Sequence, residues 1–132
     1  MKYLLDTDIL IYFLKGHAKI IEKMAHLYAD DPCTSIVNYS ELLFGAYHSN
    51  RVKQNLDIMS ALMADIKILP FCPQAAEIFA KEKAKLKIKG ETIADLDLMI
   101  ASISIQNNVI LVSNNIKHFS RLSHLKLENW AA

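Results

Sequence analysis

Short hydrophobic runs alternate along the chain with longer segments whose hydrophobic positions recur every three or four residues. The short runs predict buried strands at residues 2–5, 33–34, 66–69, 109–112 and 125–127. The longer segments predict helices at residues 9–14, 19–28, 36–48, 52–65, 73 to about 87, and 92–106, with a short helix within 113–121. Strands that alternate with helices are typical of parallel βαβ units, so the pattern indicates an α/β fold.

Polar residues and glycines mark where these helices begin and end. We expect Asp8, Ser35 and Thr92 to cap the N-termini of the helices that follow them. Pro73 is suited to the first turn of the long helix, and Gly90 is suited to its end.

Composition limits the class of protein. The chain has 132 residues, of which 52% are hydrophobic and 22% charged, so it predicts one folded domain over 1–132 and excludes a disordered chain. A net charge of +1 excludes a strongly basic nucleic-acid coat protein, but it allows an enzyme with one basic patch.

The hydrophobic stretches of the chain indicate where in the cell the protein is located. Asp6 and Asp8 break the apolar N-terminus, so it does not resemble a signal peptide, and no stretch is long enough to span a membrane. Cys33 and Cys72 have no metal-ligand spacing and are expected to be buried, reduced thiols. We therefore expect a cytoplasmic protein.

Acidic residues follow the first strand and occur in two helices. Ligands of parallel sheets bind beyond the carboxyl ends of the strands, which points to Asp6 and to residues 113–115. Glu41 lies beside Val37 and Phe44, at the edge of a helix's hydrophobic stripe. Two alternatives stay open: Asp6 could only cap a helix, and Glu41 could simply reach water.

Asp95 and Asp97 cannot both join such a cluster, because residues two apart on a helix point about 200° apart. Asp97, which precedes the most apolar part of its helix, is the better candidate, and Asp95 is expected to meet solvent or cap the helix. Three carboxylates in one place repel one another, unless one is protonated or a divalent cation neutralises them. Mg²⁺ and Mn²⁺ prefer such oxygen ligands, and they polarise phosphoryl groups and activate water.

Four segments, in order, resemble the motifs of PIN-domain ribonucleases. They are residues 4–11 with Asp6, 35–46 with Glu41, 97–101 with Asp97, and 111–119. The closing segment 125–130 is similar to the tail of VapC toxins, which belong to type II toxin–antitoxin pairs. The resemblance covers nearly the whole chain.

The resemblance implies a three-layer α/β/α sandwich around a short parallel sheet. It also implies a Mg²⁺- or Mn²⁺-dependent endoribonuclease, usually a homodimer, that is inhibited by a VapB-type antitoxin. Asp6, Glu41 and Asp97 would hold the metal, and water bound there would attack phosphorus, leaving a 5′-phosphate and a 3′-hydroxyl. The enterobacterial members imply the anticodon loop of initiator tRNA as the candidate substrate.

Further residues in or near the motifs are candidates for supporting roles at the site. Many relatives have a fourth acid where this chain has Asn115. Asn115 is still a candidate catalytic residue, because it can form a hydrogen bond or orient a water, but it removes a negative charge and argues against a strong second metal site. Ser113 and Thr7 would orient carboxylates. The side chains of Lys117, His118 and Arg121 follow the fourth strand and are candidates for contact with the RNA backbone.

Several alternatives remain at this stage. Asp6-Thr7-Asp8 also resembles the nucleophile segment of haloacid-dehalogenase-like phosphatases, although no later acidic strand end supports that reading. A metal-free histidine mechanism and a non-catalytic interaction module are further possibilities. The lysines at 81–89 form either a solvated helix face or a phosphate track, and residues 9–14 and 56–63 offer apolar surface for a second copy or an antitoxin helix.

Overall fold

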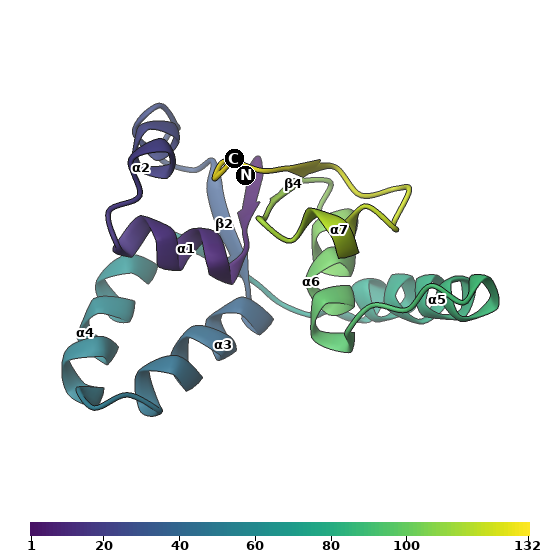
Figure 1. Cartoon of the computed structure of the whole chain (residues 1–132), viewed down its shortest axis with the longest axis horizontal. Coiled ribbons are helices and arrows are strands. Elements are labelled where there is room, and N and C mark those ends of the chain that lie inside the picture. The colour runs from purple at the N-terminus through teal and green to yellow at the C-terminus, as the bar shows by residue number, and fades with distance from the viewer.

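The computed structural model describes all residues 1–132, and a five-stranded parallel sheet lies at its centre (Figure 1). The strands are β1 (Tyr3–Leu5), β2 (Pro32–Ser35), β3 (Lys67–Leu69), β4 (Ile110–Val112) and β5 (Leu127–Glu128). Their order is β3-β2-β1-β4-β5, so the chain reverses its direction of travel across the sheet between β1 and β4. Residues that follow these two strands therefore meet at a switch point, where parallel sheets bind ligands.

Helices cover both faces of the sheet. They are α1 (Thr7–Leu14), α2 (Ala18–Ala25), α3 (Ile36–Tyr47), α4 (Val52–Met63), α5 (Pro73–Lys89), α6 (Asp95–Gln106) and α7 (Ile116–Phe119). Figure 1 shows α1, α2 and α4 on one side of the sheet and α5 and α6 on the other. This confirms the three-layer α/β/α arrangement. α3 contacts helices of both layers, since it packs against α1, α4 and α6.

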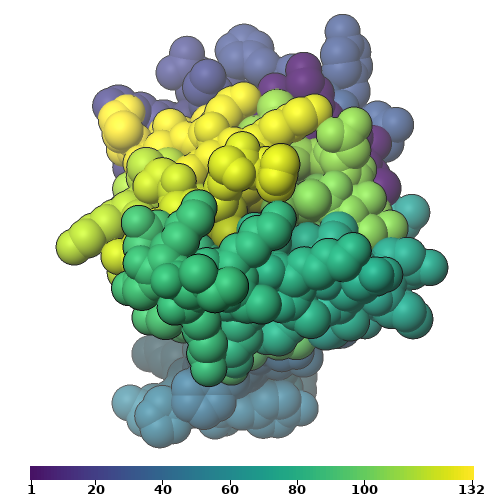
Figure 2. All heavy atoms as spheres, turned by 90° about the vertical axis from the view of Figure 1, so that its right-hand side faces the viewer, coloured from purple at the N-terminus to yellow at the C-terminus, as the bar shows by residue number.

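Two hydrophobic cores separate the layers. Successive side chains of a strand point to opposite faces, so Leu4 packs with the α5 and α6 side chains and Leu5 with the α1 and α2 side chains. Figure 2 shows α5 lying across its side of the molecule, below the C-terminal segment. The fully buried Ile100 and Ile103 of α6 face the sheet beneath this cover.

The element predictions are right in kind, and two of the three predicted N-caps are wrong. The Ser35 side chain caps α3 by accepting from the Asn38 N–H, and Gly90 ends α5 in the left-handed conformation with φ 70°. Asp6 caps α1 instead of Asp8, because the extended backbone of β1 passes into the helix without a loop. The N-cap position of α6 is Ala94 instead of Thr92, and no side chain caps this helix.

The Thr92 carbonyl, two residues before the Ala94 N-cap position, accepts a hydrogen bond from the Arg121 guanidinium. The last strand also lies one to two residues later than the predicted 125–127, because Leu127 and Glu128 pair with Leu111 and Val112 of β4.

The cysteines are free, as expected. Cys33 is buried and its thiol donates to the Tyr3 carbonyl, and burial raises its pKa to about 11. Cys72 is only half-buried, in contrast to the prediction, because it precedes α5 at the edge of the core. None of the helices is both long enough and apolar enough to cross a lipid bilayer.

Candidate active site

Asp6 lies at the carboxyl end of β1 and is held by hydrogen bonds from three elements. Its Oδ1 accepts from the Thr7 N–H at 2.9 Å and from Asn38 Nδ2 at 2.8 Å. Its Oδ2 accepts from the Ser113 hydroxyl at 2.7 Å. The residue is 7% exposed, so these donors replace the water that a buried carboxylate needs. Asp6 is therefore both the cap of α1 and a carboxylate fixed in one orientation.

Asn38 is part of this network, although it was not among the residues predicted for the site. It is completely buried on α3, and its Nδ2 also reaches Thr7 Oγ1 at 3.0 Å. Its Oδ1 accepts from the Ser35 hydroxyl at 2.6 Å. The signal in the sequence was its spacing: Asn38 lies three residues before Glu41, so the two share one face of the helix.

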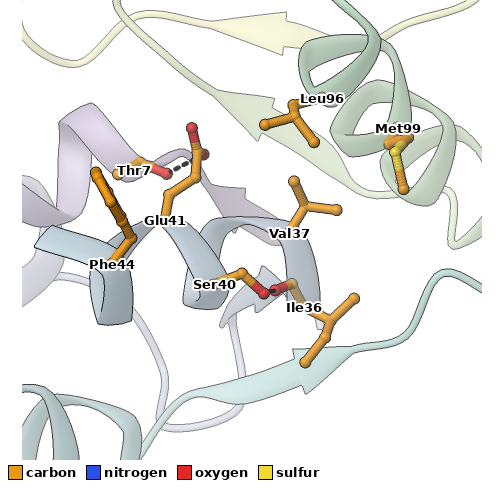
Figure 3. A pocket seen from close by; sticks show the side chains of 8 residues that line it. All are labelled: Thr7, Ile36, Val37, Ser40, Glu41, Phe44, Leu96 and Met99. Carbon is orange, nitrogen blue, oxygen red and sulfur yellow. Dashed lines mark hydrogen bonds between the residues drawn. The ribbon is translucent and has the colours of Figure 1, made fainter. Parts of the chain in front are cut away.

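Glu41 faces the same region from α3. Thr7 Oγ1 donates to Glu41 Oε1 at 2.8 Å, as Figure 3 shows. Burial raises the pKa of Glu41, Thr7 opposes that shift, and the charges of Asp6 and Asp97 add to it. Glu41 also lines an apolar cleft of about 690 Å³ between α3 and α6, with Phe44 and Leu96 among its walls.

Asp97 approaches from the first turn of α6. It is half-buried, and burial raises its pKa, while the Asp6 charge raises it further and His118 lowers it. No hydrogen bond from the protein reaches its carboxylate. Asp95 points elsewhere, since it is exposed and pairs with Lys83 at 2.9 Å. The two acids thus separate around the helix as their spacing predicts.

Asp8 is a fourth acid near the site, although it was predicted only as a helix cap. Burial raises its pKa to about 6, and the charges of Asp6 and Asp97 contribute. Its Oδ2 accepts from the Asn114 N–H at 3.0 Å, whereas its Oδ1 is buried with no hydrogen-bond partner. Residue spacing alone gives no sign of this environment, because the Asn114 loop comes from the far end of the chain.

The fourth motif, residues 111–119, forms another wall of the site. The Asn115 N–H donates to Ser113 Oγ at 2.9 Å, and Asn115 Oδ1 lies 3.0 Å from His118 Nδ1. Lys117 and His118 are exposed on α7. Arg121 is engaged by the Thr92 carbonyl, so its guanidinium also ties this wall to the segment before α6.

The lysines of α5 mostly have acidic neighbours. Lys81 pairs with Glu77 and Lys85 with Glu82 on α5 itself, while Lys83 pairs with Asp95 of α6. These exposed pairs favour the solvated helix face over the phosphate track.

The donor set suits a hard divalent cation, although it does not form a closed cage. As the side chains stand, no three His, Cys, Asp or Glu side chains converge to hold a metal ion. The three carboxylates are nevertheless close in space: beyond the effect of burial, the Asp6 charge raises the pKa of both Glu41 and Asp97, and the Asp97 charge adds to the rise at Glu41. Mg²⁺ commonly keeps several waters and uses one or two carboxylates, which is compatible with an open cluster of this kind.

Comparison with known proteins identifies the family. The sequence pattern of the PIN domain matches residues 3–125. The chain belongs to the PIN domain family. Ribonuclease VapC2 of Haemophilus influenzae is 34% identical over 130 residues, which cover 98% of both chains. The tRNA(fMet)-specific endonuclease VapC of Shigella flexneri is 29% identical over 131 residues, which cover 99% of both.

Solved structures agree with this PIN domain assignment. VapBC2 from Rickettsia felis, bound to a DNA fragment from its promoter, matches at 32% identity with a TM-score of 0.90, over 98% of this chain and 99% of that one. VapBC-1 from nontypeable Haemophilus influenzae matches at 30% identity with a TM-score of 0.91 over the full length of both chains. The resemblance to VapC ribonucleases is therefore confirmed, and the phosphatase alternative is set aside.

Proposed function

We propose that this PIN domain, spanning 1–132, is a metal-dependent endoribonuclease toxin that is neutralised by a VapB-type antitoxin. One observation carries the proposal: Asp6, Glu41 and Asp97, from β1, α3 and α6, gather within electrostatic reach of one another at the switch point of the sheet. The full-length similarity to VapC ribonucleases supports the choice of RNA as substrate.

Asp6, Asp97 and Glu41 would hold Mg²⁺ or Mn²⁺, in part through water. When bound, the ion supplies positive charge against the scissile phosphate and makes water more acidic. Neutralisation would also offset the Asp6 charge, which adds to the effect of burial in raising the pKa values of Glu41 and Asp97. Water ligands suit the open geometry, since no closed cage of side chains exists.

Side chains of the protein orient the acidic residues and accept the proton. Three donors fix Asp6, so its carboxylate keeps one orientation, and the Thr7 hydroxyl orients Glu41. Asp97 accepts no hydrogen bond from the protein, so its carboxylate is free to accept the proton of the attacking water. Attack by water, with no part for the ribose 2′-hydroxyl, leaves a 5′-phosphate and a 3′-hydroxyl.

The anticodon loop of initiator tRNA is the proposed substrate, because the Shigella flexneri relative is specific for tRNA(fMet). The purified chain should cut initiator tRNA in Mg²⁺ or Mn²⁺ and should leave elongator methionine tRNA intact. End mapping should find 5′-phosphates, and a chelator should stop the reaction. Cleavage that continues in chelator would support the histidine mechanism, and no cleavage of any cellular RNA after brief expression would support a non-catalytic module.

The antitoxin is proposed to place an apolar helix in a groove of about 830 Å³ between α1, α2 and α4. The groove is lined mainly by hydrophobic side chains, among them Phe13 and Leu14 of α1 and Ile58 and Leu62 of α4. These residues belong to the two segments, 9–14 and 56–63, whose apolar surface exceeds the needs of a core. Ile9 and Leu10, in contrast, are fully buried in the core, so only the end of α1 is open.

One variant pair tests this groove. Ile58→Glu places a charge in the groove, and Gln54→Glu places the same charge one turn earlier on α4, outside it. Ile58→Glu should remain active while escaping inhibition by the antitoxin, whereas Gln54→Glu should be inhibited like the wild type. Light scattering of the purified chain tests the proposed homodimer separately.

A further inference from the structure

Hydrogen bonds through Ser113 and Asn115 link the buried carboxylate of Asp6 to the exposed imidazole of His118. The Ser113 hydroxyl donates to Asp6 at 2.7 Å, and the Asn115 N–H donates to the Ser113 oxygen at 2.9 Å. The Asn115 side-chain oxygen then lies 3.0 Å from His118 Nδ1. Each link is short, so the position of the His118 ring is coupled to that of the central carboxylate.

Asn115 therefore already has a partner for its side-chain oxygen. An amide oxygen only accepts, so the proton of this bond lies on His118 Nδ1. Nε2 has no hydrogen-bond partner in the protein, and the residue is exposed on α7. The bond thus fixes the ring and leaves its other nitrogen available to a ligand.

The ring also lies close to the acidic cluster. The positive charge of His118 lowers the pKa of Asp97, which places the imidazole within electrostatic reach of that carboxylate. A protonated imidazole at this position offers one N–H to Asn115 and a second to a phosphate oxygen. Charge-assisted bonds of this type are roughly twice as strong as neutral ones.

We propose that His118, oriented by Asn115, binds a phosphate oxygen of the RNA beside the acidic cluster and supplies there a positive charge that belongs to the protein itself. Asn115 is then a positioning residue for His118. This inference rests on the proposed ribonuclease function and names the group that contacts the substrate backbone at that site.

Binding in the absence of metal tests the inference without relying on catalysis. The probe is a fluorescein-labelled anticodon stem-loop of initiator tRNA in chelator, followed by anisotropy over a series of salt concentrations. His118→Gln should weaken binding about tenfold. It should also reduce the slope of log K against log salt by roughly one, as expected for the loss of one phosphate contact.

Three further variants make the test specific. His26→Gln, an exposed histidine at the end of α2, should bind like the wild type. His118→Lys should restore the salt slope, because it restores the charge. Asn115→Ala should weaken binding by a smaller factor, and it should add nothing when His118→Gln is already present, because both changes remove one interaction.

The outcomes separate this inference from the function on which it rests. If the wild type cuts the probe in Mg²⁺ but His118→Gln and His26→Gln bind it equally well, the inference is wrong and the ribonuclease stands. If His118→Gln weakens binding only together with a lower Tm, and His118→Lys restores neither, the residue is structural and the inference is again wrong. If the wild type neither binds nor cuts the probe, the proposed function fails, and the inference with it.

Discussion

Asp6 and Asp97 both contribute a carboxylate to one cluster, yet they differ in the hydrogen bonds that they receive from the protein. Asp6 receives hydrogen bonds from β1's own exit, from α3 and from the end of β4. Asp97 is half-buried beside it and receives none. The protein thus satisfies the first carboxylate itself and leaves the second for something outside the chain.

This difference separates stability from function within a single site. Removing a group that is well hydrogen-bonded leaves buried donors unpaired, which costs stability. Removing a charge that is repelled by its neighbours and poorly solvated relieves a cost. Asp6 should therefore contribute to both folding and activity, whereas Asp97 should contribute to activity at the expense of folding.

Asp6→Asn should have the largest effect. Cleavage of the tRNA stem-loop should fall by about three orders of magnitude, because the central anionic ligand is lost. The amide would also direct N–H groups toward Asn38 or Ser113, which lowers the free energy of unfolding by about 1–3 kcal/mol. Single-turnover cleavage and urea unfolding measure the two effects. Full activity in this variant would remove Asp6 from the mechanism.

Asp97→Asn should separate the two properties. Cleavage should fall about a hundredfold, a loss typical of a missing general base. In chelator, the free energy of unfolding at pH 7.5 should rise, because the raised pKa of Asp97 means that its charged form destabilises the folded state. A lower stability in this variant would show that Asp97 is held by contacts, contrary to the comparison with Asp6.

Metal binding should shift stability in the same direction as that neutralisation. Mg²⁺ or Mn²⁺ should raise the Tm of the wild type, corresponding to about 2.7 kcal/mol when the ion is at a hundred times its Kd. The rise should be lost in Asp6→Asn and strongly reduced in Asp97→Asn. A Tm that does not respond to either ion, measured by calorimetry, would contradict a metal site at this cluster.

Asp8→Asn should give the smallest effect. The pKa of Asp8 is raised to about 6 by burial, so its contribution to stability is complete below pH 4 and is lost as the pH rises through 6. Since the group is partly exposed, Asp8→Asn should raise the free energy of unfolding at pH 7.5 by roughly 1 kcal/mol in chelator. It should have no effect on stability at pH 4. Thermal unfolding at both pH values checks the sign.

Local patterns were enough for the elements and for a parallel sheet, whereas the three-layer arrangement was predicted from the resemblance to a known family. The apolar runs gave strands at nearly their observed positions, and the alternation with helices gave the parallel sheet. The N-cap residues were predicted less accurately, because the start of a helix depends on where the preceding segment ends and on the direction in which the chain continues. Asp6 caps α1 since β1 runs straight into it, and the N-cap position of α6 is Ala94, two residues after the predicted Thr92.

The sequence by itself determined the α/β fold, the order of the four motifs, and the family to which they belong. These properties follow from hydrophobic periodicity and from residue types at set spacings along the chain. Only the tertiary structure decided that Asn38 and Ser113 hold Asp6, that Asp97 is left without a donor, and that Asn115 turns to His118. Those contacts join residues up to 107 positions apart, and their energies depend on burial and direction, which no spacing in the sequence encodes.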